Sequence, residues 1–404
     1  MLKLAWRNIW RKRGRSLFTA LAVALVVIFS IFYSGLVGGI RNAFFTSLVS
    51  TGGHIQIHPQ NYRDARDFGD TLIRNAAHVN ASVSSVLPAN TDFVEVLQTG
   101  GLLEGSNGRS RGVALVGLRQ PTNLRETFIK DYVVEGRLPN DNDVEGIALG
   151  AALARSLKVS LGDTVYMYAS GTEGYGAAAY TVLGLLETPN SQATAYTSLL
   201  AAQELAAPDS VSRVEIHLAD FKKISDNENL PLVKTQVEKT LTSEYSVETW
   251  DEVNPELKGY LDLIGPASLI FTLVFFILAG LVVMNTVYLS IIERVREFGV
   301  MMALGLSRWK VMLMVFYESL LLCGTGAVFG GIIGGLILWR TSQQGLSLPI
   351  PEDFQLPGTL YTSVTIERMF IIVLFVFITG IFAALWPART AGRLEPVEAM
   401  RFTA

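Results

Sequence analysis

Four long runs of apolar residues constrain this chain more than any other feature of its sequence. They cover residues 17–40, 263–292, 311–339 and 369–386. Each is close to or above the about 20 residues that an α-helix needs to cross the hydrocarbon core of a membrane. Residues 41–262 contain no comparable run. We therefore predict an integral membrane α-helical protein with four transmembrane helices and one large water-exposed domain after the first.

The distribution of charge predicts which segments share a side of the membrane. Residues 41–262 carry 18 basic and 28 acidic side chains, a net charge of −10, whereas the whole chain has −3 and the remaining segments therefore carry +7. Basic segments stay on the cytoplasmic side. We predict that residues 1–16, 293–310 and 387–404 are cytoplasmic, and that residues 41–262 and the short loop 340–368 are extracytoplasmic. The first run exceeds the about 7 to 15 apolar residues of a signal peptide.

The large domain reads as α+β with two subdomains. Alternating and amphipathic patterns predict strands at 54–58, 93–97, 112–118, 211–218 and 245–250 and helices at 70–86 and 230–241. The middle section, around residues 132–168, differs in being rich in glycines that indicate turns. We predict that residues 41–118 and 205–262 form one discontinuous α+β subdomain and that residues 119–204 form an inserted β-rich subdomain.

The N-terminal segment, residues 1–16, has the pattern of an amphipathic helix lying in the membrane interface. Leu2, Trp6, Ile9 and Trp10 share one helical face, and six basic residues surround it. We predict that four of these residues contact membrane lipids: Trp6, Arg7, Trp10 and Arg11. A nucleic-acid partner is disfavoured because the charges abut a membrane span and the chain as a whole is acidic.

Two features inside the apolar runs are candidate sites. Gly326, Gly330 and Gly334 recur every four residues and so allow another helix to approach closely, either within the chain or from a second subunit. Glu318 lies about 12 Å along the helix from Lys310, a depth at which a carboxylate either faces protein or extends to the headgroups. Asn285 in the second run is a possible hydrogen-bond partner.

Residues 293–310, between the second and third runs, combine charges of both signs with a short apolar face of Val295, Phe298 and Met302. This pattern predicts a short helix too polar to enter lipid, with Gly305 as its stop and Ser307 as the N-cap of the next span. We expect the apolar face, with Phe298 at its centre, to anchor a partner.

These residues closely resemble the cytoplasmic signature of the FtsX-like permease family, which includes permeases of the MacB and LolC/LolE types. The N-terminal stretch 4–11 and the C-terminal stretches 386–389 and 395–401 are similar to the ends of that family. Within the large domain, residues 135–137, 148–150, 153–154 and 161–163 resemble the MacB-type periplasmic domain.

The resemblance implies a permease subunit of an ABC transporter of the type VII, mechanotransmission class in the bacterial inner membrane. Its coupling helix to the ATPase would comprise Glu293, Arg294, Arg296, Glu297, Phe298, Met301, Met302, Ala303, Leu304 and Gly305. It further implies two copies of the ATPase, a second permease copy or paralogue, and a lipoprotein, lipid or amphipathic peptide as cargo, with a possible periplasmic adaptor. The chain has no Walker A sequence, so ATP and Mg are expected on a separate polypeptide and no cofactor on this one. The alternative is a signalling or scaffold protein that regulates a periplasmic partner such as a cell-wall hydrolase.

Catalytic motifs are weak in this sequence. His54 and His58 could share one face of a strand, but no cysteine or further histidine clusters with them as a metal site needs. Gly174, Gly176 and Ala179 form a loose dinucleotide pattern that precedes a predicted strand instead of a helix. We therefore expect no catalytic activity and no metal site in this chain.

Overall fold

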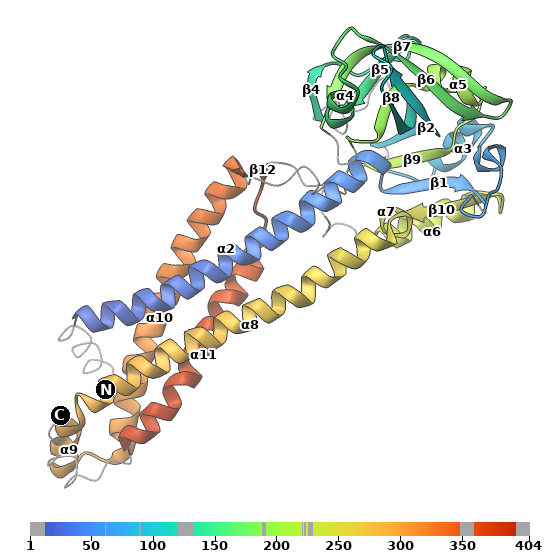
Figure 1. Cartoon of the computed structure of the whole chain (residues 1–404). Coiled ribbons are helices and arrows are strands. Elements are labelled where there is room, and N and C mark those ends of the chain that lie inside the picture. The colour runs from blue at the N-terminus through green and yellow to red at the C-terminus, as the bar shows by residue number, and fades with distance from the viewer. Residues whose placement is uncertain are drawn as a thin grey trace. The chain divides into compact units, whose positions relative to one another are not determined.

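The computed structural model describes residues 13–60, 62–88, 90–119, 132–187, 191–219, 221, 224, 229–347 and 359–392. They divide into two compact units, a helical unit that includes residues up to 41 and from 260 onward, and an α/β unit formed by residues 42–259 (Figure 1).

The helical unit is built from four long helices and one short one. The long helices are α2 (Arg13–Gly52), α8 (Pro255–Ile292), α10 (Arg308–Gln344) and α11 (Ile366–Gly392), and the short one is α9 (Val295–Ala303). The four long helices are long and apolar enough to cross a membrane, which confirms the predicted fold class. They extend beyond the apolar runs because helical hydrogen bonding continues into the polar flanks: α2 ends at Gly52, and α8 begins at Pro255.

The long helices bury a narrow apolar seam and leave wide apolar faces exposed. Val27 and Ile31 of α2 pack in one core cluster with Val283 of α8, Ala327 of α10 and Val376 of α11. Many large apolar side chains of the same helices remain more than half exposed, such as Phe271, Phe329 and Trp386. Faces of this composition suit contact with lipid chains. Two short strands, β11 (Leu346–Ser347) and β12 (Thr359–Leu360), pair beyond α10.

The α/β unit is built on one ten-stranded sheet with the order β10-β1-β9-β2-β3-β8-β5-β7-β4, in which β6 pairs with β2 and β7. The strands are β1 (Ile55–Pro59), β2 (Thr91–Gly105), β3 (Ser110–Arg119), β4 (Val133–Gly136), β5 (Gly146–Gly150), β6 (Thr164–Gly171), β7 (Gly174–Leu186), β8 (Thr194–Ser198), β9 (Arg213–Leu218) and β10 (Tyr245–Thr249). The helices are η1 (Phe68–Thr71), α3 (Ala76–Ser84), α4 (Ala151–Leu157), α5 (Leu199–Ala206), α6 (Leu230–Thr240) and α7 (Trp250–Val253).

The boundary between the two parts of this unit differs from the predicted one after residue 118. The first half of β2 pairs with β9, and its last five residues pair with β6. Leu103 of β2 and Leu115 of β3 join the core of the inserted part, together with Leu149 and Leu153. The long β2–β3 hairpin thus belongs to both parts. Because each strand is continuous, its sequence pattern does not show where its side chains pass from one hydrophobic core to the other.

The predicted helix at 70–86 is wrong in its first half. Residues 68–71 form the 3-10 helix η1, and Ile73 then makes an isolated bridge to Val211. The α-helix begins only after Asn75, whose side chain caps it by accepting a hydrogen bond from the backbone N–H of His78. Tertiary pairing of Ile73 therefore overrides the local helical pattern.

Candidate functional site

Helix α9 lies between α8 and α10 in the sequence, and a hydrogen-bonded turn ends it on its C-terminal side. Gly305 has φ +95°, and the N–H groups of Gly305 and Leu306 donate to the carbonyls of Met302 and Met301, at 3.0 Å each. This is the Schellman arrangement, which needs a residue in the left-handed region after the helix. Ser307 then stands at the N-cap position of α10. A hydrogen-bonded turn of four residues therefore joins the short helix α9 to the long helix α10.

The apolar face of α9 is buried within the chain. Val295, Phe298 and Met302 are 6%, 1% and 9% exposed, and Phe298 and Met302 pack in the core of the helical unit with residues of α10 and α11. The prediction that this face anchors a partner is therefore wrong. A helix this short is stable in water only when its apolar face packs against the rest of the protein.

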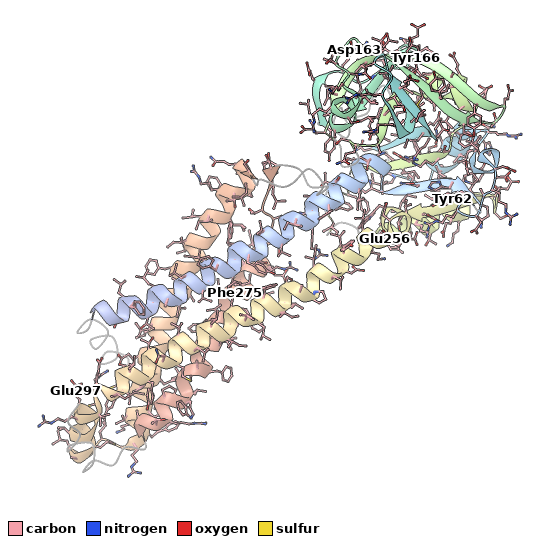
Figure 2. All side chains as sticks on the ribbon, in the orientation of Figure 1. Tyr62, Asp163, Tyr166, Glu256, Phe275 and Glu297 are labelled. Carbon is pink, nitrogen blue, oxygen red and sulfur yellow. The ribbon has the colours of Figure 1, made fainter. Side chains whose placement is uncertain are left out.

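The opposite face of α9 is exposed and carries both charge and apolar surface. Leu304 is 83% exposed and Val300 is 44% exposed. The side chains of Arg296 and Glu297 are exposed beside them, as are Ala303 and Gly305, while Met301 is half-buried. Figure 2 labels Glu297 at this end of the helical unit. This face of α9 is therefore left uncovered by the rest of the described chain.

An ion-pair network joins α9 to α10. Arg294 Nη1 donates to Glu318 Oε2 at 2.9 Å, and Arg294 Nε donates to Glu297 Oε2 at 3.1 Å. The guanidinium carbon lies 5.2 Å from the ring centroid of Phe298. The Arg294 and Glu318 side chains are only 7% and 14% exposed. Glu318 thus turns toward protein, and its partner is an arginine 24 residues earlier.

Asn285 is not the partner of Glu318. It lies on an exposed face of α8, so the suggested hydrogen bond between the two is absent from the described part of the chain. The sequence pattern places Arg294 in the loop and Glu318 in the span, and it does not pair them. The available signal was their opposite charge on either side of a sharp glycine turn.

Gly326, Gly330 and Gly334 face α2 of the same chain. A Cβ added at Gly326 would lie 2.6 Å from the Ala20 carbonyl oxygen, and one at Gly330 would lie 2.7 Å from the Ala24 carbonyl oxygen. The close approach that the spacing predicts is therefore to α2, and the alternative of a contact with a second subunit is incompatible with this packing. Glu293, at the end of α8, is exposed. Trp6, Arg7, Trp10 and Arg11 lie outside the described residues.

His54 and His58 belong to a buried polar cluster at β1 and β9. His54 Nε2 donates to the Phe221 carbonyl at 2.7 Å, and its Nδ1 accepts from the Leu218 N–H at 3.0 Å. His58 Nε2 bonds to Gln56 Oε1 at 2.9 Å. Burial lowers the pKa of His54 to about 4, and burial together with the Arg213 charge lowers that of His58 to about 3.

This histidine cluster has the properties of a structural core. Both nitrogens of His54 are already used by the protein, and no group of three or more His, Cys, Asp or Glu side chains among the described residues could hold a metal ion. Gly174, Gly176 and Ala179 all lie within strand β7, so they do not form a loop that could cradle phosphate.

Comparison with known proteins identifies both units. The model of the FtsX-like permease C-terminal family matches residues 269–396, and the model of the MacB-like periplasmic core domain matches residues 16–239, more than half of the chain. An uncharacterized ABC transporter permease of Methanocaldococcus jannaschii is 23% identical over 99% of this chain and 97% of its own length.

Two further relatives match shorter segments. The lipoprotein-releasing system transmembrane protein LolC of Xylella fastidiosa is 25% identical over 63% of this chain and 64% of its own length. The macrolide export ATP-binding/permease protein MacB of Bartonella henselae is 29% identical over 44% of this chain. The match covers 26% of that MacB, so the alignment leaves most of its length uncovered.

Proposed function

Because the chain belongs to the FtsX-like permease family and carries a MacB-like periplasmic core domain, it is an ABC transporter permease, and we propose that it couples ATP hydrolysis on a separate chain to movement of its α/β unit. Family membership implies an ATPase partner. The chain itself contains no Walker A sequence, so the nucleotide and Mg would be bound by that partner.

The exposed face of α9 carries this proposal. Its Leu304 and Val300 offer apolar contact area, and its Arg296 and Glu297 offer charges that fix orientation. The buried face and the Arg294–Glu318 ion pair join α9 to α10 without a flexible link. A displacement applied to α9 would therefore reach the long helices instead of being absorbed in the loop. This is the property that a coupling helix needs.

We further propose that the permease acts in the bacterial cytoplasmic membrane as a dimer with itself or a paralogue and with two ATPase copies. The cargo would be a lipoprotein, a lipid or an amphipathic peptide, with or without a periplasmic adaptor. One relative, LolC of Xylella fastidiosa, is named as a protein of a lipoprotein-releasing system, and this supports such a cargo. The wide apolar faces of α2, α8, α10 and α11 support it as well.

Removing the exposed apolar contacts of α9 tests the proposal. The double variant Val300→Ala, Leu304→Ala should bind the copurifying ATPase at least about tenfold more weakly, which corresponds to about 1.4 kcal/mol, and should lose stimulation of ATP hydrolysis. Leu232→Ala is a matched control because Leu232 is 65% exposed on α6 of the other unit. Unchanged ATPase recovery and stimulation in the double variant would reject α9 as the coupling element.

A further inference from the structure

Strand β10 forms one edge of the ten-stranded sheet. It stands at the end of the strand order, and β1 is its strand neighbour among the described residues. The edge of a sheet presents unpaired backbone groups that can template another strand.

The register of β10 on β1 identifies the groups that point outward. In an antiparallel ladder, alternate residues direct both N–H and C=O to one neighbour. The Trp250 N–H donates to the His54 carbonyl, and the Gln60 N–H donates to the Glu244 carbonyl. The even-numbered residues of β10 therefore face β1, and the odd-numbered ones face the free edge.

Among the outward-facing residues, Val247 alone directs both backbone groups to the edge without a partner in the described part of the chain. The Tyr245 N–H is bonded to the Thr242 carbonyl. The Thr249 N–H donates to the carboxylate of Glu252, which caps α7. Val247 therefore occupies the centre of the free edge.

A cleft of about 780 Å³ surrounds this edge. Its lining includes Arg63 and Glu248, and also Lys234, Glu238 and Leu241 from helix α6 and its end. Successive side chains of a strand point to opposite faces, so a cleft that contacts both Val247 and Glu248 wraps around the edge. Tyr62, labelled in Figure 2, holds one of these lining residues by donating a hydrogen bond to Glu248 Oε2 at 2.7 Å. The cleft is thus open along the strand that lacks a neighbour.

The charges of the cleft favour a cationic occupant. Arg63 pairs with Glu248 at 2.6 Å, and Lys234 pairs with Glu252 at 2.7 Å. Glu238, with its side chain 45% exposed, also pairs with Lys234 at 3.5 Å. Two cations therefore share three carboxylates in the lining, which leaves one negative charge in excess. The cleft sits in a domain, residues 41–262, whose 18 basic and 28 acidic side chains give −10.

We propose that β10 accepts an extended, lysine- or arginine-bearing segment of another protein as an added strand. The N–H and C=O of Val247 supply the central backbone hydrogen bonds, and Glu238 selects the positive side chain. In this mode of recognition the backbone provides affinity and the neighbouring side chains provide specificity. A second copy of this chain is a poor occupant because it would place two acidic clefts against each other.

A strand-forming peptide tests the proposal on the full chain in detergent micelles. The probe is fluorescein-labelled Thr-Lys-Val-Thr-Val-Lys-Thr, and its binding is followed by fluorescence anisotropy. A version N-methylated at alternate backbone amides should bind at least tenfold more weakly. Val247→Pro should weaken binding of the probe at least tenfold, because proline removes the outward N–H and is tolerated at edge strands. Glu238→Lys should weaken the lysine probe severalfold and strengthen a probe with glutamate in place of lysine.

The controls keep each outcome decisive. Glu173→Lys changes the same charge on the exposed turn between β6 and β7 and should leave binding unchanged. A lower urea midpoint of the domain in Val247→Pro would mean that this variant is destabilised. The test then depends on the N-methylated peptide and on Glu238→Lys. Equal binding of the methylated and unmethylated probes overturns the proposal. A second result would also overturn it: the probe does not bind, and Val247→Pro dissociates a dimer of the protein. In that case the edge of β10 joins two copies of this chain.

Discussion

At the scale of single residues, the Arg294–Glu318 pair decides how α9 is attached to the membrane helices. Both side chains are largely buried, and the arginine also contacts Glu297 and the ring of Phe298. Removing one member of a buried pair is far more damaging than replacing both, because a lone buried charge is left behind. The pair is therefore best tested by comparing single and double variants.

Glu318→Leu should destabilise the protein by about 3 to 5 kcal/mol, since it leaves the Arg294 guanidinium buried without its carboxylate. Glu318→Gln should be milder because the amide still accepts a hydrogen bond. The double variant Arg294→Met, Glu318→Leu should recover much of the loss. Thermal unfolding in detergent measures these variants together with the single variant Arg294→Met. If the losses of Arg294→Met and Glu318→Leu add up to the loss of the double variant, the two side chains do not interact.

Acid should destabilise the α/β unit through His54 and His58. Both are neutral in the folded protein, with pKa values lowered from 6.5 to about 4 and about 3. Their stabilisation is complete above pH 6.5, where the unfolded state is also neutral, and it is lost as the pH falls from 6.5 toward about 4. Each histidine contributes about 1.4 kcal/mol per pH unit in that window.

Urea unfolding at a series of pH values measures this slope. His58→Gln should make it shallower, because it removes a buried imidazole whose pKa is lowered. An identical slope in His58→Gln and in the unaltered protein would contradict the assignment of the proton to this cluster.

At the scale of elements, the contact between α10 and α2 depends on glycines that admit no side chain. Gly330→Ala would place a Cβ 2.7 Å from the Ala24 carbonyl oxygen and 2.8 Å from Val27 Cβ. The helices must then separate, so we expect a loss of about 1 to 3 kcal/mol. Gly324→Ala is the matched control, because its Cβ would meet only Phe377 at 3.5 Å. Thermal unfolding that ranks Gly324→Ala as the more damaging change would contradict this packing.

At the scale of the whole molecule, the charge distribution predicts that the α/β unit and α9 face opposite sides of the membrane. Asn142→Cys and Ser307→Cys place a thiol at exposed positions in the two regions, in a Cys323→Ser background that removes the buried native thiol. An impermeant maleimide applied outside cells should label the first and spare the second. Equal labelling would overturn the predicted orientation.

Features that depend on local composition can be predicted from the residues alone. Four apolar runs predicted the four long helices because spanning a membrane requires length and apolarity, both of which are local properties. Gly305 marked the end of α9 because few residues other than glycine adopt a left-handed conformation readily. The spacing of Gly326, Gly330 and Gly334 indicated a close helix contact without naming its partner.

Which of these segments contact one another is known only from the folded chain. The folded chain buries the apolar face of α9 that was expected to bind a partner, and exposes Leu304 instead. Glu318 pairs with Arg294 instead of Asn285. Strand β2 pairs with β9 in its first half and with β6 in its last five residues, so it belongs to both parts of the α/β unit. The free edge at Val247 likewise emerged from strand order and register. Each of these outcomes depends on contacts between residues distant in sequence, which no local pattern of hydropathy or charge records.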